Sequence, residues 1–280
     1  MERVGESWGA ARGSFGFGDA HPGGSFGWVL AGFVGAYALA GTLLALSLAG
    51  LGDFLVPGMA FLVLLCVGVF AGSLLDARRT AQRFYLALSL VPSLSIARLA
   101  FLGVSVPIFD PLFVYLLFAV ALLAFRQSTG SGQAPGRMSR RQVPRALILG
   151  SGLAAAFAIL GVVLPLASGP VTPLPLWMSL PILAPIALLD ELWFRGFLQQ
   201  GLAGATTARQ GWLATAVLFV AYGAPFGTPT VLLFRAAFGV TLGALAMRPV
   251  NLPAALVART VMAVALVALA PGLSGASLIV

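Results

Sequence analysis

The chain has few of the residues that soluble proteins use for surfaces and chemistry. Only 9% of its 280 residues are charged, whereas a soluble domain carries roughly 25%. It has no lysine among its 16 basic residues, one histidine, His21, and one cysteine, Cys66. A single cysteine excludes an internal disulfide. Because no histidine or cysteine cluster is available for zinc, the sequence predicts neither a metal site nor a cofactor.

Apolar residues are abundant instead. They make up 60% of the sequence, and the mean hydropathy is +1.02. Several stretches exceed the roughly 18 apolar residues that indicate a membrane-spanning helix. The sequence therefore predicts an all-α, polytopic integral membrane helix bundle of about nine helices, with eight as the alternative. We expect the helices near residues 28–49, 55–75, 84–106, 109–125, 146–168, 176–203, 210–224, 229–247 and 252–271.

The net charge of +8 comes from arginines that gather in short loops between apolar segments. The most basic loops are 76–83 and 126–145, and basic loops favour the cytoplasmic side of a membrane. Nine helices then place the N-terminus, Arg209 and Arg248 inside and the C-terminus outside. We expect a bacterial plasma membrane protein whose partners are the lipid bilayer and a membrane-associated peptide or protein, but no nucleic acid.

The composition changes along the chain, and these changes suggest domain boundaries. Residues 1–26 are rich in glycine and predict a disordered tail, which contains His21. Residues 27–125 predict a four-helix membrane half, and the Gly/Ser/Pro-rich segment 126–145 predicts a basic cytoplasmic linker. A five-helix membrane core follows over residues 146–272, and residues 273–280 form a C-terminal tail.

The stretch LLDELWFRGFLQQ, residues 188–200, places three ionisable side chains within an apolar helix. Glu191 and Arg195 are four residues apart and can form an ion pair on one helix face. Asp190 points about 100° away. Two interpretations stay open at this point. Asp190 faces the bundle and acts as a general base on water, or all three side chains lie at the membrane interface and stabilise the helix end.

The same stretch resembles the sequence signature of the CPBP family, which comprises CAAX proteases, bacteriocin-processing enzymes and Abi-like intramembrane endopeptidases. That signature is Glu-Glu-x-x-x-Arg followed by Gly-Phe-Leu, and this chain has Asp in place of the first Glu. The resemblance extends over the C-terminal half and implies an intramembrane endopeptidase. It also implies that the first acid works with a histidine to activate water, and that a second histidine and an asparagine stabilise the oxyanion. The matching residues are Asp190, Glu191, Arg195, Gly196, Phe197 and Leu198.

The chain departs from the family pattern where the histidines are expected. Phe219 matches the start of Phe-x-x-x-His, but the histidine position is Gly223, which follows Tyr222. In the last helix the second histidine position is Arg259 and the asparagine position is Ala263. No histidine occurs after residue 21, so both motif histidines are replaced.

We hypothesise that Arg195, Arg235 and Arg259 converge on the acid pair in a buried ionic cluster. In this cluster Arg259 neutralises Asp190, because an arginine without a partner inside a membrane is costly. For Arg235, extension towards the interface is an equal alternative, and for Arg98 it is the preferred one. Three functions stay open: a non-catalytic CPBP relative, which the missing histidines favour, an active protease with Asp190 as base, and a small transporter.

Overall fold

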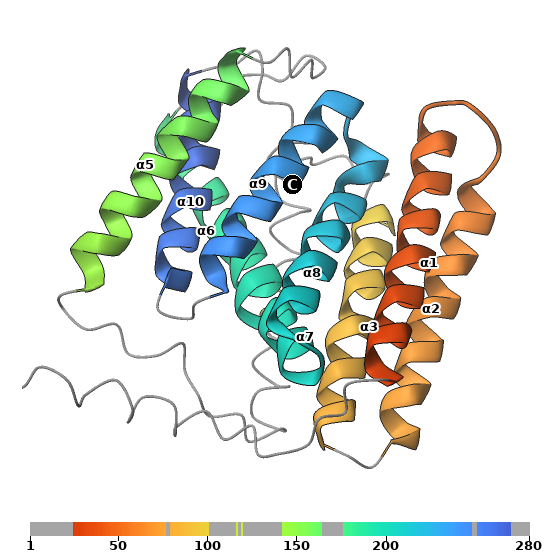
Figure 1. Cartoon of the computed structure of the whole chain (residues 1–280). Helices are drawn as coiled ribbons and strands as arrows, with labels where there is room; N and C mark the ends of the chain where they lie inside the picture. Colours follow the sequence, from red (N-terminus) through yellow and green to blue (C-terminus); the bar gives the residue numbers. More distant parts are fainter. Residues whose placement is uncertain are drawn as a thin grey trace, which may run out of the picture.

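The structure, a computed structural model, describes residues 25–76, 79–100, 116, 119, 142–163, 176–247 and 251–269. Within these ranges the regular elements are all helices (Figure 1), which confirms the predicted all-α bundle. The predicted helix at 109–125 lies outside the described residues, apart from two isolated positions. The N-terminal tail up to residue 24, most of the linker and the C-terminal tail also lie outside them. The count of nine helices stays a prediction.

Eleven helical segments follow one another along the described residues. A π-helix, η2, links α6 directly to α7, and a short 3-10 helix, η3, follows α8. The segments are α1 (Ser25–Leu48), α2 (Leu55–Leu75), α3 (Arg79–Ala100), α5 (Gln142–Val163), α6 (Leu176–Glu191), η2 (Leu192–Leu198), α7 (Gln199–Ala205), α8 (Ala208–Gly223), η3 (Ala224–Phe226), α9 (Pro229–Ala246) and α10 (Leu252–Leu269).

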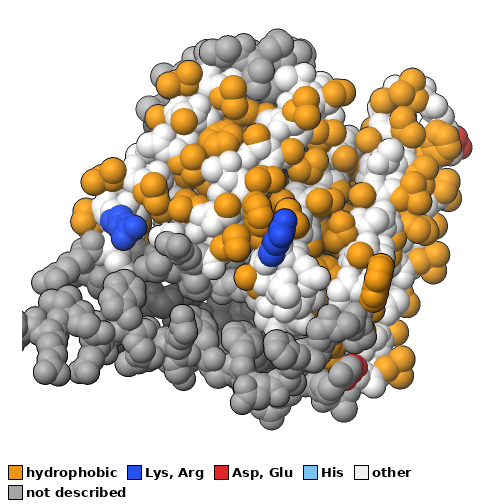
Figure 2. Space-filling model, viewed as in Figure 1, with side chains coloured by type: hydrophobic (Ala, Val, Ile, Leu, Met, Phe, Trp, Pro, Cys, Tyr) orange, Lys and Arg blue, Asp and Glu red, His pale blue; other side chains and the backbone are white. Residues whose placement is uncertain are grey.

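The helices have the dimensions and surface of membrane-spanning segments. In the described part of the chain, α1, α2, α5 and α9 are long and apolar enough to cross a membrane. Large apolar side chains cover the outer faces, including Leu64 and Val67 on α2 and Ile148 on α5. Figure 2 shows hydrophobic side chains spread over the face in view, with few charged ones among them. The chain is therefore an integral membrane protein.

Two of the described helices begin four or five residues earlier than the hydropathy predicts. The helix α3 begins at Arg79 instead of residue 84, and α5 begins at Gln142 instead of residue 146. The polar residues Gln82 and Arg83 are good helix formers, so they extend a helix without adding hydropathy. Pro144 lies in the first turn of α5, where the missing N–H has no helical partner to lose.

Threonines define where two helices of the C-terminal half begin. The Thr207 hydroxyl accepts a hydrogen bond from the Gln210 backbone N–H at 3.1 Å, and Thr228 caps α9 in the same way. Pro229 follows at the first helical position, where its fixed φ suits helix initiation. The turns between α7, α8 and α9 are therefore sharply defined, and they bring these helices side by side.

The interior consists of two apolar clusters. The first joins α1, α2, α3, α6, η2, α7 and α8 and contains Phe84, Phe194 and Phe219. The second joins α5, α9 and α10 and contains Phe157 and Phe238. Arg259 lies where these two clusters meet, because its guanidinium is close to Phe219 of the first cluster and Phe238 of the second.

Candidate functional site

The acid pair lies at the end of α6, in the interior of the protein. Asp190 and Glu191 are 1% and 0% exposed, and Arg195, in the following π-helix, is 0% exposed. The Arg195 Nε atom donates to Glu191 Oε2 at 3.3 Å, which is the contact that the i,i+4 spacing allows. All three side chains are enclosed by other parts of the protein, as expected if they face the bundle.

The π-helix η2 was not expected from the sequence. The predicted helix 176–203 is divided into α6, which runs through Pro181 and Pro185, then η2 over Leu192–Leu198, then α7. A π-helix has i→i+5 hydrogen bonds, is rare, and occurs frequently at functional sites. Here the π-helix begins directly after Glu191 and contains Arg195. Most of the stretch that resembles the CPBP signature therefore lies in the π-helix.

Asp190 pairs with an arginine from the far end of the sequence. Arg259 Nη2 on α10 donates to Asp190 Oδ2 at 3.1 Å, and the two residues are 69 positions apart. Arg259 is 1% exposed. A charged hydrogen bond between two buried side chains is geometrically specific, and removing one partner of such a buried pair is strongly destabilising.

A single aromatic ring links the three buried arginines. The guanidinium carbons of Arg235, Arg195 and Arg259 lie 4.5, 5.2 and 5.9 Å from the centroid of the Phe219 ring. These distances are within the range of cation–π attraction. The structure thus brings together Asp190, Glu191, Arg195, Arg235 and Arg259 around Phe219, and we call these five charged residues the ionic cluster.

Gly223, at the first motif histidine position, is occupied by a neighbour's side chain. A Cβ atom at Gly223 would lie 2.5 Å from Arg235 Nε and 2.7 Å from Cζ. Arg235 is 2% exposed and stacks on Phe219, so it is enclosed on that side. The guanidinium of Arg235 therefore fills the space in which a side chain at position 223 would begin.

Two glycines on α9 make room for Arg195. A Cβ at Gly239 would lie 3.4 Å from Arg195 Nη2, and a Cβ at Gly243 would lie 3.3 Å from Nη1. The Gly243 position would also bring a Cβ to 2.6 Å from Trp212 Cδ1. The pair therefore serves close helix packing, as their small-x-x-x-small spacing indicates, and it also accommodates a site arginine.

The remaining predicted positions surround the ionic cluster. Ala263, at the asparagine position, is buried one turn after Arg259 on α10. Tyr222 packs against Phe194, with ring centroids 5.7 Å apart. The Arg98 guanidinium carbon lies 5.1 Å from the Tyr222 ring centroid, so Arg98 contacts α8 where we expected it to extend towards the interface.

Among the described residues, no group of three or more His, Cys, Asp or Glu side chains is placed to hold a metal ion. What the site offers chemically is two carboxylates, three guanidiniums and an aromatic ring. A guanidinium has five hydrogen-bond donors and no acceptor. The arrangement is thus suited to holding negative charge, and its carboxylates are its only charged acceptors.

The fold defines a polytopic integral membrane protein with a buried acid–arginine site. Comparison with known families shows which family the C-terminal half resembles. Residues 170–265 match a family model described as type II CAAX prenyl endopeptidase Rce1-like, so this part of the chain is similar to the CPBP family. No curated protein and no solved structure gives a significant match.

Proposed function

We propose that this CPBP-type membrane protein does not cleave peptides, and that it uses the family's fold to bind or scaffold a membrane-associated peptide or protein. The observation that supports this proposal most directly is the ion pair between Arg259 and Asp190, 3.1 Å between Nη2 and Oδ2. The carboxylate that resembles the family's base is held by an arginine that stands at a motif histidine position.

The chemistry of the replaced histidines supports the same proposal. A neutral imidazole can accept a proton from water, whereas a guanidinium has no acceptor atom. Position 223 carries no side chain, and the adjacent space holds Arg235. The arginines around Asp190 and Phe219 are therefore donors, which can stabilise a carboxylate but cannot replace a histidine as a base. Asp is also one methylene shorter than Glu, and a displacement of about 1 Å costs roughly 100-fold in rate.

A cleavage assay tests the proposal. The full-length protein is purified in detergent and incubated with a panel of prenylated and bacteriocin-leader peptides, beside Asp190→Ala and beside Arg209→Ala, an exposed arginine on α8. We expect no cleavage in any sample. Cleavage that is lost in Asp190→Ala and kept in Arg209→Ala would overturn the proposal and favour an active protease with Asp190 as base.

A gain-of-function variant makes the same test from the other direction. Arg259→His restores one motif histidine, and Gly223→His restores the other. Because a Cβ at Gly223 collides with Arg235, the second change also requires Arg235→Ala. We expect cleavage to appear only in the variant that combines all three changes. Cleavage by the unaltered protein would contradict this expectation.

We also propose that the N-terminus and the basic loops are cytoplasmic and that the C-terminus is outside, in a bacterial plasma membrane. The clustering of arginines at 76–83 and 126–145 supports this orientation. An alkaline phosphatase fused to the C-terminus should be active, because this enzyme folds only outside the cytoplasm of bacteria. An inactive fusion with an active N-terminal one would reverse the orientation, and inactivity of both would favour eight helices.

A further inference from the structure

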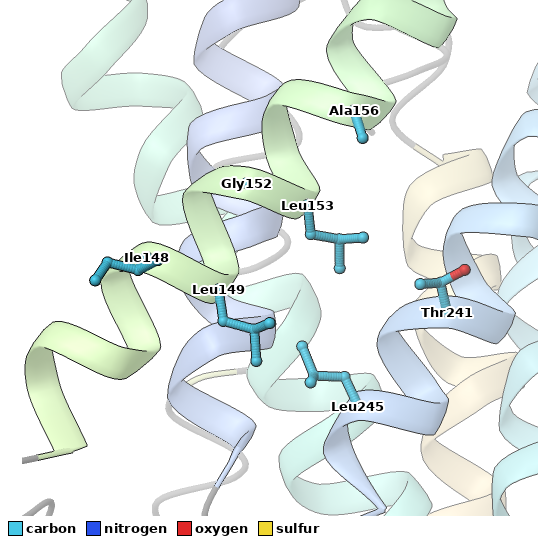
Figure 3. A pocket seen from close by; sticks show the side chains of 7 residues that line it. All are labelled: Ile148, Leu149, Gly152, Leu153, Ala156, Thr241 and Leu245. Atoms are coloured by element: carbon cyan, nitrogen blue, oxygen red, sulfur yellow. The ribbon is translucent and has the colours of Figure 1, made fainter.

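A groove on the membrane-facing side of the C-terminal half is separate from the ionic cluster. It lies between α5 and α9 and has a volume of about 540 Å³. Figure 3 shows Leu149 and Leu153 on α5 facing Leu245 and Thr241 on α9 across this space. Volumes of about 300–1,000 Å³ are typical of small-molecule sites.

The walls of this groove suit a hydrocarbon chain. Leu149, Leu153 and Leu245 are apolar, and the Thr241 hydroxyl already donates to the Ala237 carbonyl at 2.7 Å. Gly152 on α5 also lines the groove, and a Cβ placed there would have no atom within 4 Å. The groove therefore offers apolar contact and has space beside Gly152 for additional atoms.

One end of the groove carries a positive charge. A second hollow of about 440 Å³ is lined by Pro144, Arg145, Ile148 and Leu149. Because Ile148 and Leu149 line both hollows, the two adjoin along α5. Arg145 lies in the first turn of α5 and is exposed, at the end of α5 that we propose to be cytoplasmic. Basic positions at the cytoplasmic ends of transmembrane helices attract anionic lipid headgroups.

We propose that the α5–α9 groove binds an anionic phospholipid, with one acyl chain along Leu149, Gly152 and Leu153 and the headgroup phosphate against Arg145. The charge of Arg145 at the end of an apolar groove is complementary to this ligand. A neutral lipid would use only the apolar part, and a free phosphate would use only the charge. The groove and the arginine together select a molecule that has both parts.

Native mass spectrometry of the full-length protein tests this site, with phosphatidylglycerol and phosphatidylcholine of identical chains as probes. Arg145→Gln removes the charge, and Arg209→Gln is the matched control because Arg209 is an exposed arginine at the start of another helix. Gly152→Leu fills the groove. Gly68→Leu is its control, since Gly68 on α2 is exposed and also has no atom within 4 Å of a built Cβ.

We expect the unaltered protein to retain phosphatidylglycerol in preference to phosphatidylcholine. Arg145→Gln should weaken phosphatidylglycerol binding roughly fivefold, the factor that one arginine near a membrane surface contributes, and should leave phosphatidylcholine unchanged. Gly152→Leu should reduce the binding of both lipids, whereas both controls should behave like the unaltered protein. Added inorganic phosphate should not displace the lipid.

Three outcomes would overturn the proposal. The first is equal retention of the two lipids by the unaltered protein. The second is an equal loss of phosphatidylglycerol in Arg145→Gln and Arg209→Gln, which would indicate a general charge effect. The third is full occupancy in Gly152→Leu, which would place the chain elsewhere. None of these measurements depends on whether the protein cleaves peptides.

Discussion

The ion pair between Asp190 and Arg259 allows a quantitative prediction. Each residue is about 1% exposed, so replacing one partner removes the main countercharge of the other at a buried position. At the observed 3.1 Å, two unit charges attract by about 5 kcal/mol in an effective dielectric of roughly 20. Breaking a buried pair by removing one partner typically costs about 3–5 kcal/mol. We expect Arg259→Met and Asp190→Asn each to destabilise the fold by this amount.

The double variant is the decisive measurement. When both charges are absent, neither is left without its partner, and replacing a buried pair by neutral groups of similar volume is often nearly neutral. Asp190→Asn combined with Arg259→Met should therefore cost much less than the sum of the single changes. The difference defines a coupling free energy, which we expect to exceed about 2 kcal/mol, within the range for contacting residues.

The single cysteine provides the assay. Cys66 on α2 is half-buried and its Sγ lies 3.0 Å from Ser93 Oγ. A thiol-reactive fluorophore therefore reports its release as the protein unfolds in detergent with increasing temperature or denaturant. Arg209→Met, at an exposed arginine, should change the unfolding free energy by less than about 0.5 kcal/mol. If Arg259→Met costs no more than this control, or if the single changes are additive, the reasoning is refuted.

Three further predictions use the same unfolding assay. Gly223→Ala should cost about 1–3 kcal/mol because the new Cβ would lie 2.5 Å from Arg235 Nε, and in an Arg235→Ala background the cost should fall to within about 0.5 kcal/mol of zero. Gly150→Ala should cost about 1–3 kcal/mol because its Cβ would lie 2.6 Å from an α10 backbone oxygen. Gly152→Ala, whose Cβ would have no atom within 4 Å, should instead stabilise the fold by up to about 1 kcal/mol. Equal effects of the two substitutions would contradict the packing of α5 on α10. Phe219→Leu should cost more than the roughly 1.5 kcal/mol of a near-isosteric swap, because each cation–π contact adds about 0.5 kcal/mol or more; a smaller loss would mean that the ring contributes only its volume.

Much of the helical framework follows from hydropathy, because a membrane-spanning helix is specified locally by its own apolar length. The predicted range 55–75 coincides with α2, and the predicted 229–247 ends one residue after α9 does. The errors occur where polar residues continue a helix, as at the start of α3. Hydropathy registers a change in composition there, whereas the backbone continues its hydrogen bonds through residues with good helix propensity.

The site was partly predictable, for a different reason. The Glu191–Arg195 contact follows from spacing within one helix. The pairing of Arg259 with Asp190 was predictable because a charge buried in a membrane protein requires a partner of opposite charge. The chain has only two acids after residue 110, so few partners were available. The placement of Arg235 beside Gly223 could not be predicted, because it depends on how α9 packs against α8. The π-helix has no local sequence signal that we could identify.

The Asp190–Arg259 ion pair at the boundary between the two apolar clusters has a mechanical consequence. Lipid tails are as apolar as leucine, so apolar helix faces in a membrane resist sliding along one another only through the fit of their surfaces. A shift of α10 by one helical turn, about 5.4 Å, would carry Arg259 out of reach of Asp190, since the two atoms are now 3.1 Å apart. The ion pair therefore sets the depth and rotation of α10 against α6. Two buried charges thus fix the relative position of apolar helix faces that would otherwise be free to slide.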